Sequence, residues 1–233
     1  MALYDRDYAQ QRAFGYESAS RGEAQIVSFV KETYKLFAAS MMAGAVGAYV
    51  GVPMASAIAA NFWLLFALEI GLIIGLQFVK HKPGINLAVM FGFVFMTGLM
   101  LAPLLARTLG MNGGGTIIGN AFAMTSVVFG AMSFYAIKTT KDFTSYGKPL
   151  MIAVFVILGF SILNIFLGNP LLHVAISGAV VVLFSIMVIY DTQNIMNGGY
   201  ETAIDGALAL YLDFLNIFTA LLQLFGIFGG KDE

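Results

Sequence analysis

Residues 188–216, VIYDTQNIMNGGYETAIDGALALYLDFLN, place Asp191 at the end of one long apolar run and Asp213 inside the next. Apolar segments of this length normally exclude carboxylates, because ionising one away from water is costly unless it is paired or solvated. This stretch is therefore where we expect a membrane fold and a functional site to coincide.

The composition is that of a membrane protein. Of the 233 residues, 59% are hydrophobic and 11% are charged, against about 45–50% and about 25% in soluble domains. Seven runs approach or exceed the roughly 20 apolar residues that a membrane-spanning helix needs. They lie at about 36–52, 57–79, 85–106, 116–137, 150–168, 171–190 and 206–228.

Helices rather than strands are expected in these runs. Lipid offers no partners for backbone N–H and C=O groups, which a helix satisfies internally, and the short alternating segments of a transmembrane β-barrel are missing. We predict an all-α membrane protein, a seven-transmembrane-helix bundle in residues 36–228. Residues 1–35 are expected to form a cytoplasmic N-terminal segment and residues 229–233 a short C-terminal tail.

The N-terminal segment contains one helix-start motif. Ser20-Arg21-Gly22-Glu23 has the form of a capping box, which predicts a helix from about Ala24. The first 30 residues lack the pattern of a signal peptide, so the first run is expected to serve as its own insertion signal.

The basic residues predict the orientation, because lysines and arginines of short loops stay on the cytoplasmic side. Arg107 and Lys231 fall on one side and the other ten on the opposite side: Arg6, Arg12, Arg21, Lys31, Lys35, Lys80, Lys82, Lys138, Lys141 and Lys148. We expect a protein of the cell (inner) membrane with a cytoplasmic N-terminus. The C-terminus lies outside if run seven spans completely.

The seventh run carries a polar stripe on an otherwise apolar helix. On a helical wheel one narrow face contains Gly206, Ala209, Asp213, Asn216, Ala220 and Gln223. Small and polar side chains on such a helix face protein or water rather than lipid. We therefore predict that run seven is the central helix and that it lines a polar path.

Small residues also predict helix contacts. Gly47 and Gly51, like Gly71 and Gly75, have the small-xxx-small spacing that allows membrane helices to approach closely. We expect both pairs to pack within the bundle rather than to mediate dimerisation.

Three of the 13 acidic residues, Glu69, Asp191 and Asp213, lie within or at the edge of the runs. Acidic residues inside a membrane span indicate a functional site. The alternative is that the carboxylate only extends to the membrane interface, which is plausible for Asp191 and less so for Asp213. Two adjacent carboxyl groups in low dielectric cannot readily both ionise, so Asp191 and Asp213 are expected to share a proton and titrate as a unit. Losing that proton would repel the two helices. Lys80 and Lys82 are candidate counter-charges, though loop lysines usually mark orientation only.

A path lined by acidic side chains favours the passage of cations. Calcium takes about six to eight oxygen ligands, and the acids with Asn216 cannot complete that shell without water. Binding at Asp191 and Asp213 is therefore expected to be weak and transient, with calcium passing through rather than serving as a cofactor.

Two segments resemble a known family. Tyr190-Asp191-Thr192-Gln193, followed by ALALYLDFLNIF at 207–218, resembles the C-terminal signature of the Bax inhibitor family. The likeness extends, less specifically, to FVKETYKLF at 29–37 and to the seven-run layout, and the chain as a whole resembles a bacterial member of that family. The resemblance implies a seven-helix fold with a central last helix and a pH-sensitive calcium leak governed by the pair matching Asp191 and Asp213. It also implies that Glu69 lies on the ion path and that Lys80 is the basic residue that pairs with the acids in the closed state.

The resemblance leaves an alternative function open. Some bacterial relatives are associated with a membrane-bound, ATP-dependent quality-control protease whose action they modulate. This would make the protein an interaction partner in the membrane rather than a leak.

Other classes are disfavoured. Intramembrane aspartyl proteases have the motif Gly-x-Gly-Asp at the second aspartate. This chain has the bulky residues of Leu210-Tyr211-Leu212-Asp213 there, so we do not expect an enzyme of this class, and we expect no enzyme. His81 and His173 have no metal-ligand spacing and are expected in surface roles. The formal net charge of -1 gives no support for nucleic-acid binding.

Overall fold

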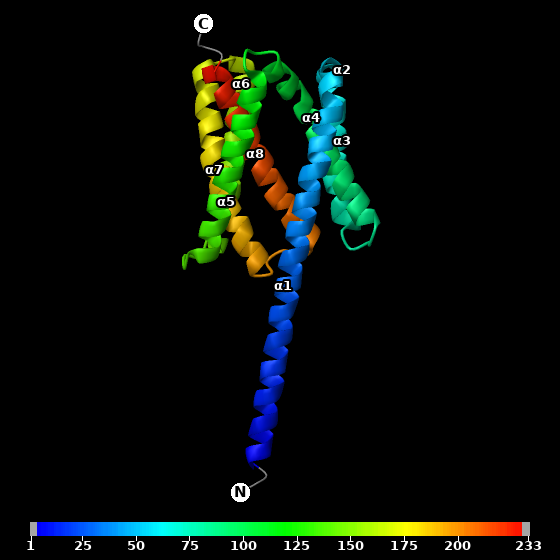
Figure 1. Cartoon of the computed structure of the whole chain (residues 1–233), viewed down its shortest axis with the longest axis vertical. Coiled ribbons are helices and arrows are strands. Elements are labelled where there is room, and N and C mark those ends of the chain that lie inside the picture. The colour runs from blue at the N-terminus through cyan, green and yellow to red at the C-terminus, as the bar shows by residue number, and fades with distance from the viewer. Residues whose placement is uncertain (1–3, 230–233) are drawn as a thin grey trace.

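The computed structural model describes residues 4–229 of the chain, and the side chains of residues 22–229. This part of the chain is built from helices joined by short connections (Figure 1). The helices are α1 (Tyr4–Gly51), α2 (Ala55–Ala60), α3 (Phe62–Val79), α4 (Ile85–Leu109), α5 (Gly114–Lys138), α6 (Gly147–Leu167), α7 (Pro170–Met196) and α8 (Ala203–Gly229), with 3-10 turns at Val52–Met54 and Thr144–Tyr146.

Seven helical segments of the described chain are long and apolar enough to cross a membrane. The first runs from Gly22 through α2 to Ala60, and the other six correspond to the remaining predicted runs. The prediction of an all-α, seven-span membrane protein is confirmed.

The predicted helix start near Ala24 is wrong, because α1 begins at Tyr4 and passes through residues 20–23 without a break. The residues of a capping motif are also tolerated inside a helix, and an interior glycine costs only about 1 kcal/mol relative to alanine. The side chains of Ser20 and Arg21 lie outside those described, as do residues 230–233 of the predicted C-terminal tail.

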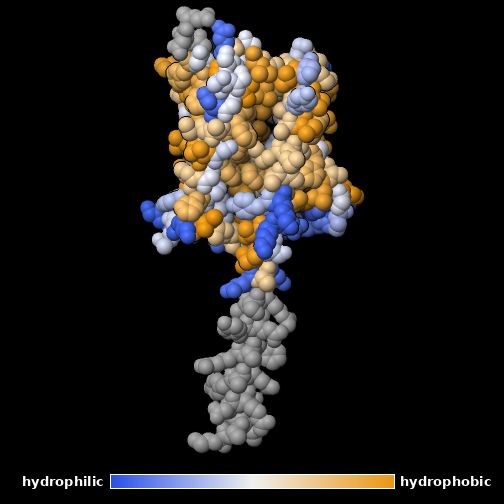
Figure 2. All heavy atoms as spheres, in the orientation of Figure 1, coloured by the Kyte–Doolittle hydropathy of each residue, from blue (hydrophilic) through white to orange (hydrophobic). Residues whose placement is uncertain are grey.

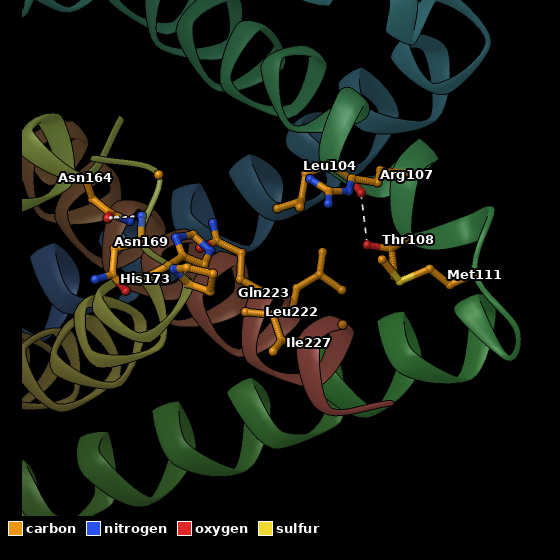
Figure 3. A pocket seen from close by; sticks show the side chains of 13 residues that line it. Leu104, Arg107, Thr108, Met111, Asn164, Asn169, His173, Leu222, Gln223 and Ile227 are labelled. Atoms are coloured by element: carbon orange, nitrogen blue, oxygen red, sulfur yellow. Dashed lines mark hydrogen bonds between the residues drawn. The ribbon is translucent and has the colours of Figure 1, made fainter. Parts of the chain in front are cut away.

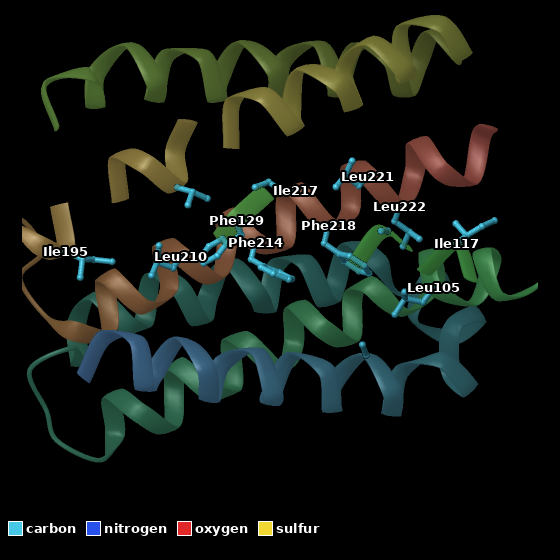
Figure 4. Packing of buried hydrophobic residues seen from close by; sticks show 13 residues of the cluster. Leu105, Ile117, Phe129, Ile195, Leu210, Phe214, Ile217, Phe218, Leu221 and Leu222 are labelled. Atoms are coloured by element: carbon cyan, nitrogen blue, oxygen red, sulfur yellow. The ribbon is translucent and has the colours of Figure 1, made fainter. Parts of the chain in front are cut away.

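Helix α8 is the central helix, as predicted. It runs obliquely through the body (Figure 1) and contacts α1, α4, α5 and α7. In its most apolar part 56% of the residues are buried, against 6% in α3. Around it packs a cluster that includes Leu210, Phe214, Ile217 and Phe218 of α8 and Phe129 of α5 (Figure 4). The apolar side of α8 is thereby buried, whereas Asn216 and Gln223 of its polar face are partly exposed.

Helices α1 and α4 approach each other through glycines. A Cβ on Gly47 would overlap the Phe95 carbonyl, and a Cβ on Gly98 would overlap the Gly44 carbonyl. Gly51 likewise faces Ala102. The predicted packing of Gly47 and Gly51 within the bundle is confirmed.

The same prediction is wrong for Gly71 and Gly75, which face open space. Helix α3 lies at the side of the bundle and packs through another face, where Leu72, Ile73 and Leu76 meet α4. The small-xxx-small spacing produces close packing only where a partner helix lies opposite, and the apolar surroundings of Gly71 do not reveal that.

The charged residues divide the bundle into two ends. Connections 80–84, 139–146 and 197–202 lie together at one end, called here the basic end, which carries Lys80, Lys82, Lys138, Lys141 and Lys148. Figure 2 shows hydrophilic groups gathered there, at the lower edge of the body. Connections 110–113 and 168–169 lie at the opposite end, close to Arg107.

Candidate functional site

Asp191 and Asp213 lie together inside the bundle near the basic end. Helix α7 continues beyond Asp191 to Met196, and α8 returns antiparallel from Ala203. Each aspartate is 2% exposed, and their carboxyl groups are within hydrogen-bonding reach of each other. Two negative charges so buried and so close are strongly disfavoured.

Tyr200 completes this pair from the α7–α8 connection. Its hydroxyl donates a hydrogen bond of 2.6 Å to Asp191 Oδ1. Burial, and next the nearby Asp191 carboxylate, raise the pKa of the Tyr200 phenol, so it remains protonated as a donor. Asp213 Oδ2 is buried and has no hydrogen-bond partner among the side chains and backbone described.

Gln193 fixes the same end of α7 to the α5–α6 connection. Its Oε1 accepts a hydrogen bond from the Phe143 N–H at 2.7 Å, and its Nε2 donates to the Lys141 carbonyl at 2.9 Å. The motif Tyr190–Gln193 therefore supplies one buried acid and one buried anchor. In the sequence Gln193 stands out only as part of the family signature, because its hydrogen bonds depend on where the α5–α6 connection lies.

Lys80 is bound to Glu201 rather than to either aspartate. His81 Nε2 lies 2.7 Å from Glu201 Oε1, so two neighbours in the α3–α4 connection hold the α7–α8 connection. Hydrogen bonds from Lys80 and His81 lower the pKa of Glu201, and the bond to Glu201 raises the pKa of Lys80. The predicted pairing of Lys80 with the buried acids is not found, because Glu201 of the α7–α8 connection pairs with the Lys80 ammonium group instead. Lys82 is exposed.

Glu201 is a residue that sequence reasoning missed. Lys80 and Glu201 lie 121 positions apart in the chain, and the only sequence signal was that their loops share the predicted cytoplasmic side.

Glu69 and Asn216 lie apart from the pair. Glu69 is half-buried on α3. Asn216 donates from Nδ2 to the Leu212 carbonyl at 2.7 Å and faces a cavity. Among the described residues, neither Glu69 nor Asn216 forms a hydrogen bond or an ion pair with Asp191 or Asp213.

Two adjoining cavities lie toward the opposite end, with volumes of about 610 Å³ and about 430 Å³. They share Asn164, His173 and Gln223, and the second also contains Asn216. The polar stripe of α8 thus leads from Asp213 to these cavities. Asp213 itself lines neither of them.

The described residues contain no group of three or more His, Cys, Asp or Glu side chains that could hold a metal ion. Two carboxyl groups provide fewer oxygens than calcium prefers. Any calcium at Asp191 and Asp213 would have to retain much of its water.

The fold and the buried pair define a class of multipass membrane protein in which the last two helices bring two carboxyl groups together around a central helix. A family model described as "Inhibitor of apoptosis-promoting Bax1" matches residues 26–230. The chain belongs to this Bax inhibitor family, as its C-terminal signature predicted.

Bacterial relatives match over most of the chain. A protein of Campylobacter jejuni is 47% identical over 99% of this chain and 100% of its own length, and one of Helicobacter pylori is 45% identical over the full length of both. The Escherichia coli protein named "Modulator of FtsH protease YccA" is 34% identical over 68% of this chain and 73% of its own. None of these descriptions names an enzymatic activity.

Proposed function

We propose that the protein is a pH-sensitive cation leak, with calcium as the permeant ion, governed by the pair Asp191–Asp213. The observation that carries the proposal is the contact of two carboxyl groups that are each 2% exposed and come from consecutive membrane-spanning helices. An acidic pair at such depth is an expensive feature unless it serves a function.

In this proposal the shared proton keeps the path closed, and we call the proton-sharing pair Asp191–Asp213 the latch. While one carboxyl group remains protonated, a hydrogen bond between the acids holds α7 and α8 together. When the proton leaves, two negative charges face each other in low dielectric and repel. Separation at this point would join the basic end to the polar face of α8.

The path beyond the pair would follow that face. Asn216 and Gln223 lead to the smaller cavity toward the opposite end, where amide and hydroxyl groups would replace water around a cation. Glu69 is proposed for the path on the family resemblance alone, since it lies on α3. Weak binding by two aspartates is consistent with passage, because a permeant ion must also leave.

The orientation belongs to the same proposal. We place the protein in the inner membrane with the basic end and the N-terminus in the cytoplasm. Supporting this are the five lysines of the basic end, against Arg107 at the opposite end.

Flux measurements in liposomes test the leak directly. Purified protein with a calcium dye should give protein-dependent flux that changes with pH, and Asp191→Asn and Asp213→Asn should flatten that profile. Asp142→Asn is the matched control, because Asp142 is exposed in the α5–α6 connection and bonds only to its local neighbours. A flux equal to that of empty liposomes would reject the leak.

A second candidate function is modulation of a membrane-bound, ATP-dependent quality-control protease. It is favoured by the printed name of the Escherichia coli relative, a modulator of FtsH protease. Affinity purification from membranes, with wild type and Asp213→Asn, would test it. Copurification of such a protease and a changed rate of substrate degradation on reconstitution would support this role, whereas degradation unaffected by the protein would exclude it.

A further inference from the structure

The larger cavity lies where α4 ends, α7 begins and α8 ends. Arg107 and Thr108 of α4 lie across it from Asn164, Asn169 and His173, with residues of α8 between them (Figure 3). None of the 13 residues that line it is acidic. Its volume of about 610 Å³ exceeds the needs of a bare ion.

The amide side chains in this cavity have their oxygens occupied by the protein. Asn169 Oδ1 accepts hydrogen bonds from the Leu171 and Leu172 N–H groups at 2.9 and 3.2 Å, and Asn164 Oδ1 accepts one from the Asn169 N–H at 3.1 Å. A backbone N–H can only donate, so these contacts fix which amide atom is the oxygen. The atoms left for a ligand are the NH2 donors.

The other polar groups show the same imbalance. Arg107 offers only N–H donors, and it forms no ion pair with any side chain of residues 22–229. Gln223 Oε1 accepts a hydrogen bond from the nearby Ser177 hydroxyl at 3.2 Å, which leaves the Gln223 NH2 group for a ligand. The Thr108 hydroxyl gives its hydrogen to the Leu104 carbonyl at 3.0 Å and so offers no donor. The cavity is therefore lined by more donors than acceptors, and its one arginine has no carboxylate partner among residues 22–229.

We propose that this cavity binds a phosphate group, carried either by a small molecule or by a lipid headgroup. Arginine binds phosphate through paired, charge-assisted hydrogen bonds, and amide NH2 groups add neutral donors to the remaining oxygens. Leu104, Met111, Leu222 and Ile227 line the rest of the cavity and suit the apolar part of a phosphorylated compound. The site lies at the ends of spanning helices, the depth at which lipid headgroups lie. The inference does not depend on the proposed leak.

Binding of inorganic phosphate to delipidated protein tests the shared chemistry. Calorimetric titration should detect phosphate binding that chloride does not reproduce. Arg107→Gln should weaken it by at least about tenfold, the loss expected for one charge-assisted contact. Lys148→Gln, which removes an exposed charge at the basic end, should bind as wild type does. Arg107→Lys should give an intermediate affinity, because it keeps the charge and loses the paired donors.

Native mass spectrometry distinguishes the lipid from the free anion. Protein exchanged into phosphatidylglycerol should retain that lipid, diacylglycerol without phosphate should not be retained, and Arg107→Gln should lose the bound lipid. Phosphate binding without lipid retention identifies a soluble ligand, and lipid retention alone identifies a headgroup. Each variant is first checked for an unchanged helical content. Absence of binding in both arms, or binding equal in wild type, Arg107→Gln and Arg107→Lys, would overturn the inference.

Discussion

The Tyr200 hydroxyl donates a 2.6 Å hydrogen bond to Asp191 Oδ1, so the α7–α8 connection touches the buried acid pair directly. The next residue, Glu201, is held by Lys80 and His81 of the α3–α4 connection. One short connection therefore links a surface ion cluster to the two carboxyl groups.

Tyr200→Phe should move the midpoint of the pH-dependent flux to higher pH by about one pH unit. The hydroxyl stabilises the ionised form of Asp191, and without it the pair keeps its proton longer. Liposome flux from about pH 5 to 8 measures the midpoint. Tyr146→Phe, which changes an exposed tyrosine at the basic end, is the control. An unmoved midpoint in Tyr200→Phe would remove Tyr200 from the latch.

Glu201→Gln should lower thermal stability at neutral pH and have no effect in strong acid. The folded pKa of Glu201 is lowered from 4.5 by Lys80 and His81, so its contribution is present above that value and is lost as pH falls through the lowered one. The folded pKa of Lys80 is raised from 10.5, so its contribution is complete below that value and is lost as pH rises through the raised one. Melting curves of both proteins at several pH values would test this. A difference that persists in strong acid would show that the pairing is not its cause.

Gly98→Ala should destabilise the protein by about 1–3 kcal/mol, because the new methyl group must push α1 away from α4. Gly71→Ala is the matched control, since Gly71 faces open space and alanine favours a helix. Unfolding in mild detergent compares the two variants. Equal stability of both would contradict the close contact described for Gly44 and Gly98.

Gln193→Leu should cost about 1–3 kcal/mol, because the Phe143 N–H and the Lys141 carbonyl lose a partner at a largely buried site. The α5–α6 connection should then exchange its amide hydrogens faster, which hydrogen-exchange mass spectrometry can measure. Gln77→Leu, at an exposed position of α3, should leave that exchange unchanged. Protection at residue 143 equal to wild type would show that another contact holds the loop.

The main features of the fold follow from the sequence, because span length and the polar stripe of α8 depend on local pattern. Asp191 and Asp213 could be predicted to meet, since antiparallel helices joined by a short connection bring such positions to one level. The position of α8 at the centre follows from its small and polar face, which lipid would not accommodate.

The pairing of Lys80 with Glu201 could not be predicted, because it joins two flexible side chains from distant loops. The open surroundings of Gly71 depend on which face of α3 meets α4, and apolar residues surround α3 except at Glu69 and Gln77. The donor-rich cavity near Arg107 arises from four helices whose ends meet only in the folded protein.

In the proposed mechanism the shared proton of Asp191 and Asp213 governs cation passage. The most direct measurement is calcium flux into liposomes containing wild type, Asp191→Asn, Asp213→Asn or Asp142→Asn, across about pH 5 to 8. Flux should depend on pH in wild type and Asp142→Asn, and its pH profile should be flattened in Asp191→Asn and Asp213→Asn. Flux with the same pH profile in all four proteins, or no flux above empty liposomes, would contradict it.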